Sequence, residues 1–405
     1  MKLLILTSYF NPDLCAGSFR SSSLVDAIER NKSEKIELKV ITTLPNRYEK
    51  YSVQASAFED HGWMQIFRIK IPKHSSGAFK QALAFLWYSY QAVKIAKDND
   101  FDLVFATSSR FLTAYIGFII AKRQKTKLYL DIRDLFTETL VQVKGGFFLR
   151  LISSLIRLLE KKMFAYACEI NVVSPAFVDY VKESTSSSKI TQFTNGIDAE
   201  FENFDFTQIF KKKYTSIIYA GNIGEGQALH KILPCVAERL IGEAEIVVVG
   251  SGGKDQLLRK IVEERGINNI KILAPVARQE LIKIYREADI LLLHLDKLPA
   301  FEKVLPSKLF EYAQTGKPIL AGVMGLPKEF LDSEVDGSFT FEPNCLKSFL
   351  VAYDKLKSEQ KYFSRSEFCL KYSRTEIMNN MAIAIIKSAS NSSTDSNQEI
   401  DGAGL

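Results

Sequence analysis

The sequence predicts an α/β protein with two domains, each built on a doubly wound parallel sheet. Its 405 residues are 46% hydrophobic and 25% charged, which is enough apolar material for two buried cores. Apolar, β-branched runs of strand length alternate with longer helical patterns. This alternation stops near the turn signal Asn195-Gly196 and starts again after Lys213, so we expect two sheets in series.

The first series of strands begins at the amino end of the chain. The run 3–7 follows Lys2 as in a signal peptide, but it is short and is followed by Asn11-Pro12-Asp13 rather than by a small-residue cleavage site. We therefore interpret it as the first strand. The other strands expected in this domain are 36–42, 66–71, 103–106, 128–131 and 170–173.

The second series predicts the strands 216–220, 244–249, 270–273, 290–295, 318–321 and 338–341. We place the hinge in the polar segment 190–213, the first domain at 1–195 and the second at 196–373. A helix expected at 374–387 is assigned to pack back on the first domain. Ser, Asn, Asp and Gly dominate 388–405, so we expect a disordered tail.

Composition narrows the class of protein. The five cysteines are scattered without a Cys-x-x-Cys pair, so neither a disulfide framework nor a zinc site is indicated, and a reducing cytoplasm fits best. The longest apolar stretch, 111–121, is well short of the roughly 18 residues that suggest a membrane span. Residues 1–190 hold 27 Lys and Arg against 18 Asp and Glu, whereas the remainder holds 26 against 29. A basic first domain favours an anionic membrane surface or substrate; nucleic acid has only this charge in its favour.

Ligands of doubly wound sheets bind beyond the carboxyl ends of the strands, so the residues that follow each strand are the candidates for ligand binding. Gly221, Asn222 and Gly224 follow the strand 216–220, where glycines allow backbone amides to approach phosphate oxygens at a helix start. Gly250 and Ser251 follow the strand 244–249. Either loop is also compatible with an ordinary tight turn.

A third segment, 306–312, is expected to begin a helix with Ser307 as its cap and Lys308 in its first turn. The amides, the helix dipole and the ammonium group would then face a diphosphate, and Glu311 would accept hydrogen bonds from ribose hydroxyls. The alternative is a capped helix with a surface lysine. We favour a functional role because the strand 318–321 follows directly, which places the helix start at the ligand edge of the sheet.

The fourth segment holds three charged residues, Asp131, Arg133 and Asp134, directly after the strand that begins at 128. Charged side chains at the end of a buried strand need a partner, so either a substrate contact or a structural ion pair is expected. The run Asp98-Asn99-Asp100 resembles a metal-binding Asp-x-Asp motif, but it lies in an expected solvated helix end. We predict neither a metal ion nor a cofactor.

These segments together resemble the retaining family 4 glycosyltransferases of the GT-B fold, and most of all bacterial surface-polysaccharide enzymes that transfer N-acetylated amino or deoxy sugars. The resemblance spans nearly the whole chain. It rests on Tyr9-Phe10-Asn11-Pro12 with Ala16-Gly17-Ser18 and Arg20, and on the segments 131–134, 194–198, 221–227 and 306–318.

The resemblance implies a site between two Rossmann-like domains. Gly17 would line the cleft near the donor, Asp134 would lie near the transferred sugar or acceptor, and 274–276 would offer backbone groups to the base. The predicted catalytic residues are Asp134, Lys308 and Glu311. The predicted donor-binding residues are Gly17, Gly221, Asn222, Gly224, Gly250, Ser251, Pro275, Val276, Ser307, Lys308, Leu309 and Glu311, and the acceptor-side residues are Arg20, Asp131, Arg133 and Asp134. One departure is Lys303, which stands where many members of the family carry a second acid, with Glu302 beside it.

The implied function is transfer of a sugar from a nucleotide diphosphate, with UDP as the expected nucleotide, to a lipid-linked saccharide of an O-antigen or capsule. The basic, aromatic-rich segments 79–97 and 145–166 are expected to dock on an anionic membrane surface, although core helices with a solvated basic face show the same pattern. The alternatives are a nucleotide-sugar 2-epimerase or hydrolase on the same fold, and a donor-binding scaffold subunit without activity.

Overall fold

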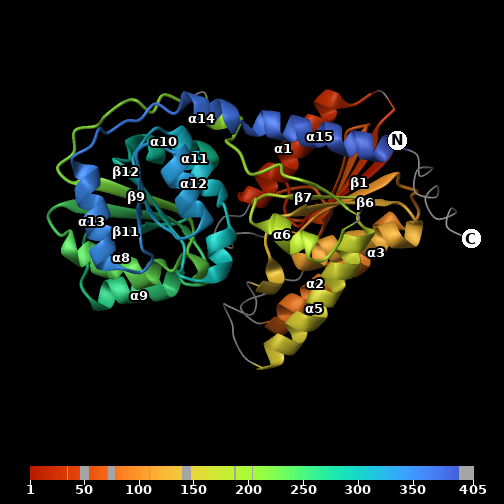
Figure 1. The fold of residues 1–405 in the computed structure, drawn as a ribbon, viewed down its shortest axis with the longest axis horizontal. Coiled ribbons are helices and arrows are strands. Elements are labelled where there is room, and N and C mark those ends of the chain that lie inside the picture. Colours follow the sequence, from red (N-terminus) through yellow and green to blue (C-terminus); the bar gives the residue numbers. More distant parts are fainter. Residues whose placement is uncertain are drawn as a thin grey trace, which may run out of the picture.

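The structure is a computed structural model that describes residues 1–33, 35–45, 54–71, 78–108, 110–138, 147–186, 188–202 and 204–391. Figure 1 shows two α/β units side by side, the N-terminal domain on the right and the C-terminal domain on the left. The fold class predicted from the alternating strands is confirmed. Most of the predicted tail, 392–405, lies outside the described residues.

The N-terminal sheet has the strand order β3-β4-β2-β1-β5-β6-β7-β8, and all of its neighbours pair in parallel except β3 and β4. Its strands are β1 (Lys2–Leu6), β2 (Glu37–Thr43), β3 (Phe58–Asp60), β4 (Met64–Ile69), β5 (Leu103–Thr107), β6 (Lys127–Ile132), β7 (Glu169–Val172) and β8 (Lys189–Thr191). The sequence did not predict β3 or β8, because three-residue strands with polar side chains carry no hydrophobic period. The order reverses at β1, between β2 and β5.

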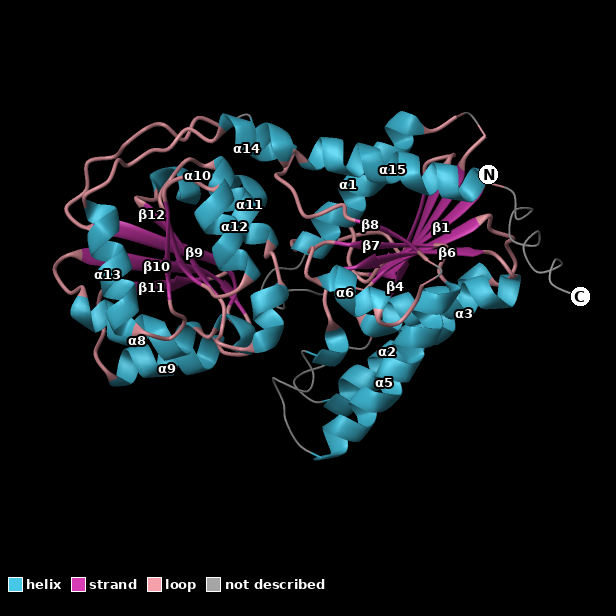
Figure 2. Ribbon diagram, in the orientation of Figure 1, coloured by secondary structure: helices cyan, strands magenta, loops and turns pink. Residues whose placement is uncertain are grey.

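Helices cover both faces of this sheet, as Figure 2 shows. One face carries α2 (Ala78–Ala96), α3 (Phe111–Gln124), α5 (Phe147–Tyr166) and α6 (Phe177–Lys182). On the other face α1 (Ala16–Asn31) packs beside α15 (Arg374–Ser390), the last described helix of the chain. Met378, Met381 and Ile385 of α15 are buried in one core with Leu24 and Ile28 of α1. The C-terminal helix therefore belongs physically to the N-terminal domain.

The C-terminal sheet is entirely parallel, with the order β11-β10-β9-β12-β13-β14, and it reverses at β9. Its strands are β9 (Thr215–Asn222), β10 (Ala244–Ser251), β11 (Ile270–Leu273), β12 (Ile290–His294), β13 (Ile319–Gly322) and β14 (Ser338–Phe341). Its helices are α7 (Ala199–Glu202), α8 (Leu229–Arg239), α9 (Asp255–Glu264), α10 (Arg278–Glu287), α11 (Ser307–Gln314), α12 (Leu326–Glu334), α13 (Leu346–Lys357) and α14 (Ser366–Lys371), with the 3₁₀ turns η1 (Glu225–Gln227) and η2 (Pro299–Lys303).

The chain crosses between the domains twice, and the two crossings are hydrogen-bonded to each other. The amide of Ile197 donates to the carbonyl of Tyr372 at 2.8 Å, and the amide of Arg374 donates to the carbonyl of Ile197 at 2.9 Å. The first crossing lies in the predicted hinge segment, after β8 and before α7. Motion of one domain against the other must therefore involve both crossings.

Candidate functional site

A cleft of about 590 Å³ lies between the domains, at the carboxyl ends of both sheets. Tyr9 follows β1 and Gly221 is the last residue but one of β9, so the two points where the strand order reverses both face the cleft. Ligands of open α/β sheets bind at such points. Of the predicted site residues, the cleft is lined by Gly17, Arg133, Asp134, Gly221, Asn222, Gly250, Pro275, Val276, Ser307, Lys308 and Glu311.

Lys308 lies on the C-terminal wall, in the first turn of α11. Its Nζ sits 3.6 Å from the centre of the Tyr219 ring and fills the space that a side chain at Gly221 would need, since a Cβ there would lie 2.7 Å from it. Burial lowers the pKa of Lys308 to about 7, an effect that the nearby Glu311 carboxylate opposes. A cation buried in this way is stabilised when an anion binds beside it.

The backbone around Lys308 also favours an anion. The prediction that Ser307 caps α11 is wrong, because Pro306 holds the cap position in an extended conformation and Ser307 is the first helical residue. No side chain caps α11, so its first amides remain available at the cleft. Gly250 has a φ of +148° and approaches the Gly221 carbonyl so closely that a Cβ would lie 1.9 Å from its oxygen. Both strand ends therefore require glycine.

Glu311 is 7% exposed and forms an ion pair that the sequence analysis missed. Arg278 donates from Nη1 to Oε1 of Glu311 at 3.0 Å and from Nη2 to Asp198. Although burial disfavours its charge, the carboxylates of Glu311 and Asp198 raise the pKa of Arg278. Its guanidinium carbon lies 4.6 Å from the ring centres of both Phe19 and Phe201. Oε2 of Glu311 has no hydrogen-bond partner among the described residues, so this oxygen is available to hydroxyl donors.

His294 also lines the cleft, but its geometry indicates a structural role. Its Nδ1 donates to the carbonyl of Gln227 at 2.8 Å, and its Nε2 accepts from the amide of Asn344 at 3.2 Å. Burial lowers the pKa of His294 to about 4, so the ring is neutral at physiological pH. With both nitrogens engaged, His294 is poorly suited to proton transfer.

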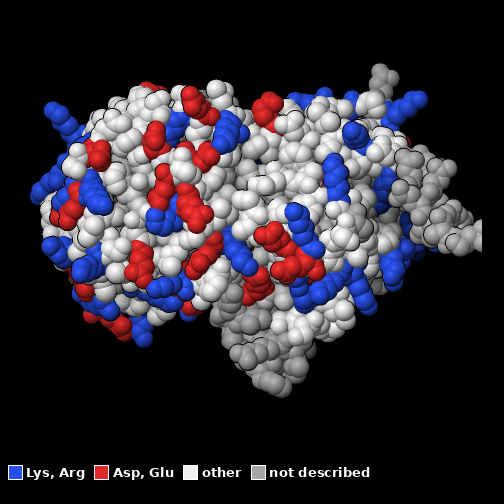
Figure 3. Space-filling view, viewed as in Figure 1, with Lys and Arg blue, Asp and Glu red and all other residues white. Residues whose placement is uncertain are grey.

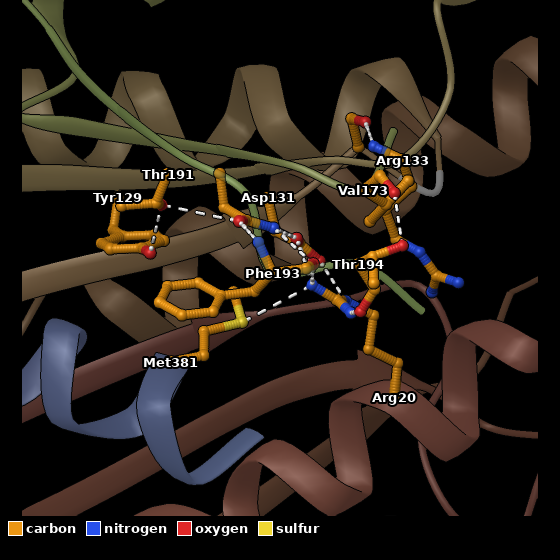
Figure 4. A network of polar contacts seen from close by, with 11 residues as sticks. Arg20, Tyr129, Asp131, Arg133, Val173, Thr191, Phe193, Thr194 and Met381 are labelled. Atoms are coloured by element: carbon orange, nitrogen blue, oxygen red, sulfur yellow. Dashed lines mark hydrogen bonds and ion pairs between the residues drawn. The ribbon is translucent and has the colours of Figure 1, made fainter. Parts of the chain in front are cut away.

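Arg20 and Asp131 meet in a buried pair behind the N-terminal wall (Figure 4). Arg20 donates from Nε and from Nη2 to the two oxygens of Asp131, both at 3.0 Å, and from Nη1 to the carbonyl of Thr194 at 2.7 Å. Asn171 donates to the same carboxylate at 2.7 Å. These contacts join α1, β6, β7 and the first crossing. Neither Arg20 nor Asp131 lines the cleft, and their described contacts are structural.

Other predicted positions also lie off the cleft lining. Gly224, Ser251 and Leu309 do not line it, and Leu309 is fully buried in the C-terminal core. The loop after Gly221 does not open directly into a helix, because η1 precedes α8. Lys303 pairs with Glu138 of the N-terminal domain, with its Nζ 2.9 Å from a carboxylate oxygen, so it does not replace the missing family acid in the cleft.

Sequence reasoning also missed several lining residues. One of them is Arg278, which stands only two positions after the predicted Val276. The other missed polar residues of the lining include Tyr9, Arg110, Asn195, Tyr219, Gln227, Tyr285 and His294. No group of three or more His, Cys, Asp or Glu side chains suited to a metal ion occurs within the described part of the chain. No helix there is long and apolar enough to span a bilayer.

Residues 200–367, which make up most of the C-terminal domain, match the family described as glycosyl transferases group 1. The putative colanic acid biosynthesis glycosyl transferase WcaI of Escherichia coli (strain K12) is 31% identical over 130 residues, which are 32% of this chain and 31% of that protein. The match thus spans about a third of the curated relative. The C-terminal domain is thus similar to glycosyl transferases group 1.

Solved structures share the whole architecture. That of Anabaena Alr3699/HepE in complex with UDP-glucose superposes with a TM-score of 0.66 at 15% identity, over 96% of this chain and all of that one. A putative UDP-N-acetylglucosamine 2-epimerase from Listeria monocytogenes superposes with a TM-score of 0.59 at 13% identity, over 96% of each chain. The chain has the GT-B fold, in which two Rossmann-like domains face a central cleft.

Proposed function

We propose that this chain is a retaining glycosyltransferase that moves a sugar, an N-acetylated amino or deoxy sugar in the first instance, from UDP to a lipid-linked saccharide in surface-polysaccharide biosynthesis. The observation that carries the proposal is the pairing of Lys308 and the uncapped start of α11 with a buried carboxylate, Glu311, one turn further on. The colanic acid relative and the UDP-glucose complex of a structural neighbour support the polysaccharide context and the donor.

The proposed mechanism places the diphosphate in the cleft against Lys308 and the first turn of α11. Charge that develops on the departing diphosphate is stabilised by the ammonium of Lys308 and by the first amides of α11, groups that are already in position before reaction. Glu311 binds the ribose hydroxyls through Oε2 while Arg278 holds Oε1. Asp134, exposed on the opposite wall, orients the transferred sugar or the acceptor hydroxyl. In a retaining transfer the acceptor approaches the face that the diphosphate leaves, and a phosphate oxygen takes its proton.

The direct test is turnover by the purified chain with UDP- and GDP-sugars and a lipid-diphosphate saccharide, in the presence of EDTA. Lys308→Met should weaken UDP binding about tenfold or more, because hydrogen bonds to charged groups contribute about 1.5–3 kcal/mol. Lys347→Met is the matched control, since Lys347 is the exposed second residue of α13 as Lys308 is the second of α11. Glu311→Gln should weaken binding of UDP more than of inorganic pyrophosphate, which has no ribose.

The outcomes separate the competing functions. Activity that survives EDTA and falls in both variants supports a transferase that needs no metal, and nuclear magnetic resonance of the new anomeric centre reports retention or inversion. Release of a free or epimerised sugar without acceptor would favour the 2-epimerase or hydrolase class, which the neutral, fully engaged His294 disfavours. UDP binding without any turnover would favour a scaffold subunit.

We further propose that the N-terminal domain docks on an anionic membrane through α2 and α5, which both pack beside α3. The large apolar side chains exposed on these helices are Leu86, Trp87 and Tyr90 of α2 with Leu155 and Leu158 of α5. On the face shown in Figure 3, blue Lys and Arg side chains lie along the right-hand edge of this domain. An apolar patch flanked by cations is the combination that binds anionic lipid surfaces.

Co-sedimentation with vesicles tests this docking. The wild type should bind phosphatidylglycerol vesicles more tightly than phosphatidylcholine vesicles, and less tightly at high salt. Replacing Leu86 and Trp87 by Ser should reduce the bound fraction. Leu370→Ser, on the other domain and 79% exposed, is the control. Equal binding of the wild type and the double variant would refute docking through α2.

A further inference from the structure

Arg133, the residue directly after β6, carries a buried guanidinium that the proposed mechanism does not use. Its Nε and Nη1 atoms are buried and have no hydrogen-bond partner among the described residues, although Arg133 lines the cleft. Only its backbone amide is engaged, by the hydroxyl of Ser108 at 2.8 Å, as Figure 4 shows. Arg68, Arg157 and Arg374 also have a buried nitrogen without a partner, but each of them forms an ion pair with an acid. Arg286 also has a buried Nε without a partner, but it does not line the cleft.

The acids next to Arg133 attract its charge but do not satisfy its Nε and Nη1 donors. Asp131 is held on both oxygens by Arg20 and on one by Asn171. Burial and the positive charge of Arg20 lower the pKa of Arg133, and the charges of Asp131 and Asp134 oppose this shift only in part, yet a guanidinium stays protonated in proteins. A buried guanidinium whose Nε and Nη1 have no hydrogen-bond partner costs several kcal/mol, which a bound anion would offset.

A second cation lies on the same wall. Arg110 lines the cleft and donates from Nη2 and Nε to the hydroxyl of Tyr9, at 2.7 and 3.2 Å. Its guanidinium stacks over Phe85 at 5.1 Å, and it forms no ion pair with an acid of the described chain. The start of α1, at Ala16, has no side-chain cap and lines the cleft beside these residues, so its amides add to the positive potential.

We propose that Arg133 and Arg110 form a phosphate-binding site on the N-terminal wall of the cleft, which takes a phosphate group of a substrate. The proposal rests on the proposed function, because both substrates of that reaction carry a diphosphate. Guanidinium groups bind phosphate oxygens in pairs and are desolvated at lower cost than ammonium groups. The site is separate from the lysine of the C-terminal wall, and its phosphate comes either from the acceptor or from the donor.

Kinetics with two acceptors distinguish these sources. The variants are Arg133→Gln, Arg133→Lys and the control Arg239→Gln, which changes an exposed arginine at the end of α8. If the site takes the acceptor phosphate, Arg133→Gln should raise KM for a lipid-diphosphate saccharide about tenfold or more, and leave KM for the same saccharide on a neutral lipid unchanged. If it takes the donor phosphate, the Kd for UDP should rise by that factor instead. Arg133→Lys should lie between wild type and Arg133→Gln, because it keeps the charge but loses the paired hydrogen bonds.

A binding measurement tests the site without turnover. In the Lys308→Met background, inorganic pyrophosphate should still raise the unfolding temperature, and adding Arg133→Gln should abolish that rise. Without ligand, Arg133→Gln should unfold at the same temperature as its parent or higher, since an unpartnered buried charge is removed. A lower unfolding temperature together with unchanged phosphate binding would show that Arg133 is structural and would overturn the proposal. If the wild type is active and the Arg133 variants have the same KM and Kd as the wild type, this site alone is refuted. If the wild type shows no turnover, the proposed function is refuted.

Discussion

At the scale of single residues, the cleft holds buried charged groups whose protonation changes when a ligand binds. Lys308 has an aromatic ring beneath its ammonium and lies one turn from Glu311 in α11. Its lowered pKa of about 7 means that the free protein holds this lysine partly neutral at physiological pH. Binding of a diphosphate and protonation of Lys308 should therefore favour each other.

Binding of UDP should consequently weaken as the pH rises above 7. The ammonium form binds the anion, its pKa in the free protein is about 7, and the bound diphosphate raises it. Above the free pKa the affinity should fall by up to about tenfold per pH unit, until the pKa of the complex is reached. Calorimetry at about pH 7 and about pH 9 measures this decrease. Lys308→Met should show a flat profile, and a flat profile for the wild type would contradict the prediction.

The Arg20–Asp131 pair should act on stability rather than on binding. Arg20→Met leaves the Asp131 carboxylate buried without its cation, which should cost about 3–5 kcal/mol in the free energy of unfolding. The double variant Arg20→Met, Asp131→Leu should recover part of that loss. Urea titration measures both. Lys271→Met, which breaks an exposed pair with Glu245, should change stability by about 1 kcal/mol or less. A full loss of UDP binding with unchanged stability would instead make Arg20 a substrate contact.

At the scale of elements, short segments link the donor side of the cleft to the interdomain crossings. Arg278 begins α10 and binds Glu311 of α11 and Asp198, which precedes α7. Arg374, the first residue of α15, pairs with the other oxygen of Asp198 at 3.0 Å and donates to the carbonyl of Gly196. A chain of ion pairs thus connects Glu311, the carboxylate proposed to hold the ribose, to both crossings.

Arg278→Gln should weaken UDP binding and loosen the crossings together. It leaves Glu311 and Asp198 without their shared cation, so we expect a loss of about 3–5 kcal/mol in unfolding free energy and a weaker donor site. Hydrogen exchange should increase at 196–198 and 372–374, where the crossings are hydrogen-bonded to each other. Lys260→Gln, which removes an exposed i,i+4 partner of Glu264 in α9, is the control. Unchanged exchange at the crossings would show that the ion pairs do not couple them to the site.

At the scale of the whole molecule, the segment just before α11 docks on the N-terminal domain. Lys303 pairs with Glu138, the hydroxyl of Ser174 donates to the carbonyl of Lys303 at 2.5 Å, and Asn195 donates to the carbonyl of Leu305 at 3.2 Å. Val304 packs against the N-terminal core. The segment 303–305 therefore both contacts the N-terminal domain and leads into the helix that carries Lys308, so domain closure and the position of Lys308 are linked.

Lys303→Met should shift the domains toward an open arrangement by a small amount. The lysine is 40% exposed, so the pair contributes about 1 kcal/mol or less, which changes the ratio of closed to open by about fivefold at most. Small-angle scattering with and without UDP measures the radius of gyration. Lys371→Met, which breaks the pair with Glu334 inside the C-terminal domain, is the control. An equal response of both variants would exclude a role for Lys303 in closure.

The sequence by itself determined the fold class and the edge where the site lies. Apolar runs with turn signals located most of the strands, and the segments after β9, β10 and β6 supplied residues that line the cleft, because strand period and strand ends are local properties. It missed β3 and β8, which are too short to carry a period. It also assigned the cap of α11 to Ser307 instead of Pro306, because cap conformation depends on how the chain enters the helix.

Only the tertiary structure decided which charges are paired. Arg20 and Asp131 are 111 positions apart in the chain, and Arg278 and Glu311 come from different helices, so no spacing rule joins them. Arg133 looked like the partner of its neighbouring acids, yet Asp131 is occupied by Arg20 and the Arg133 guanidinium faces the cleft without a partner among the described residues. The physical reason is that burial and long-range contacts set the cost of each charge, and both arise only when the two sheets and α15 come together.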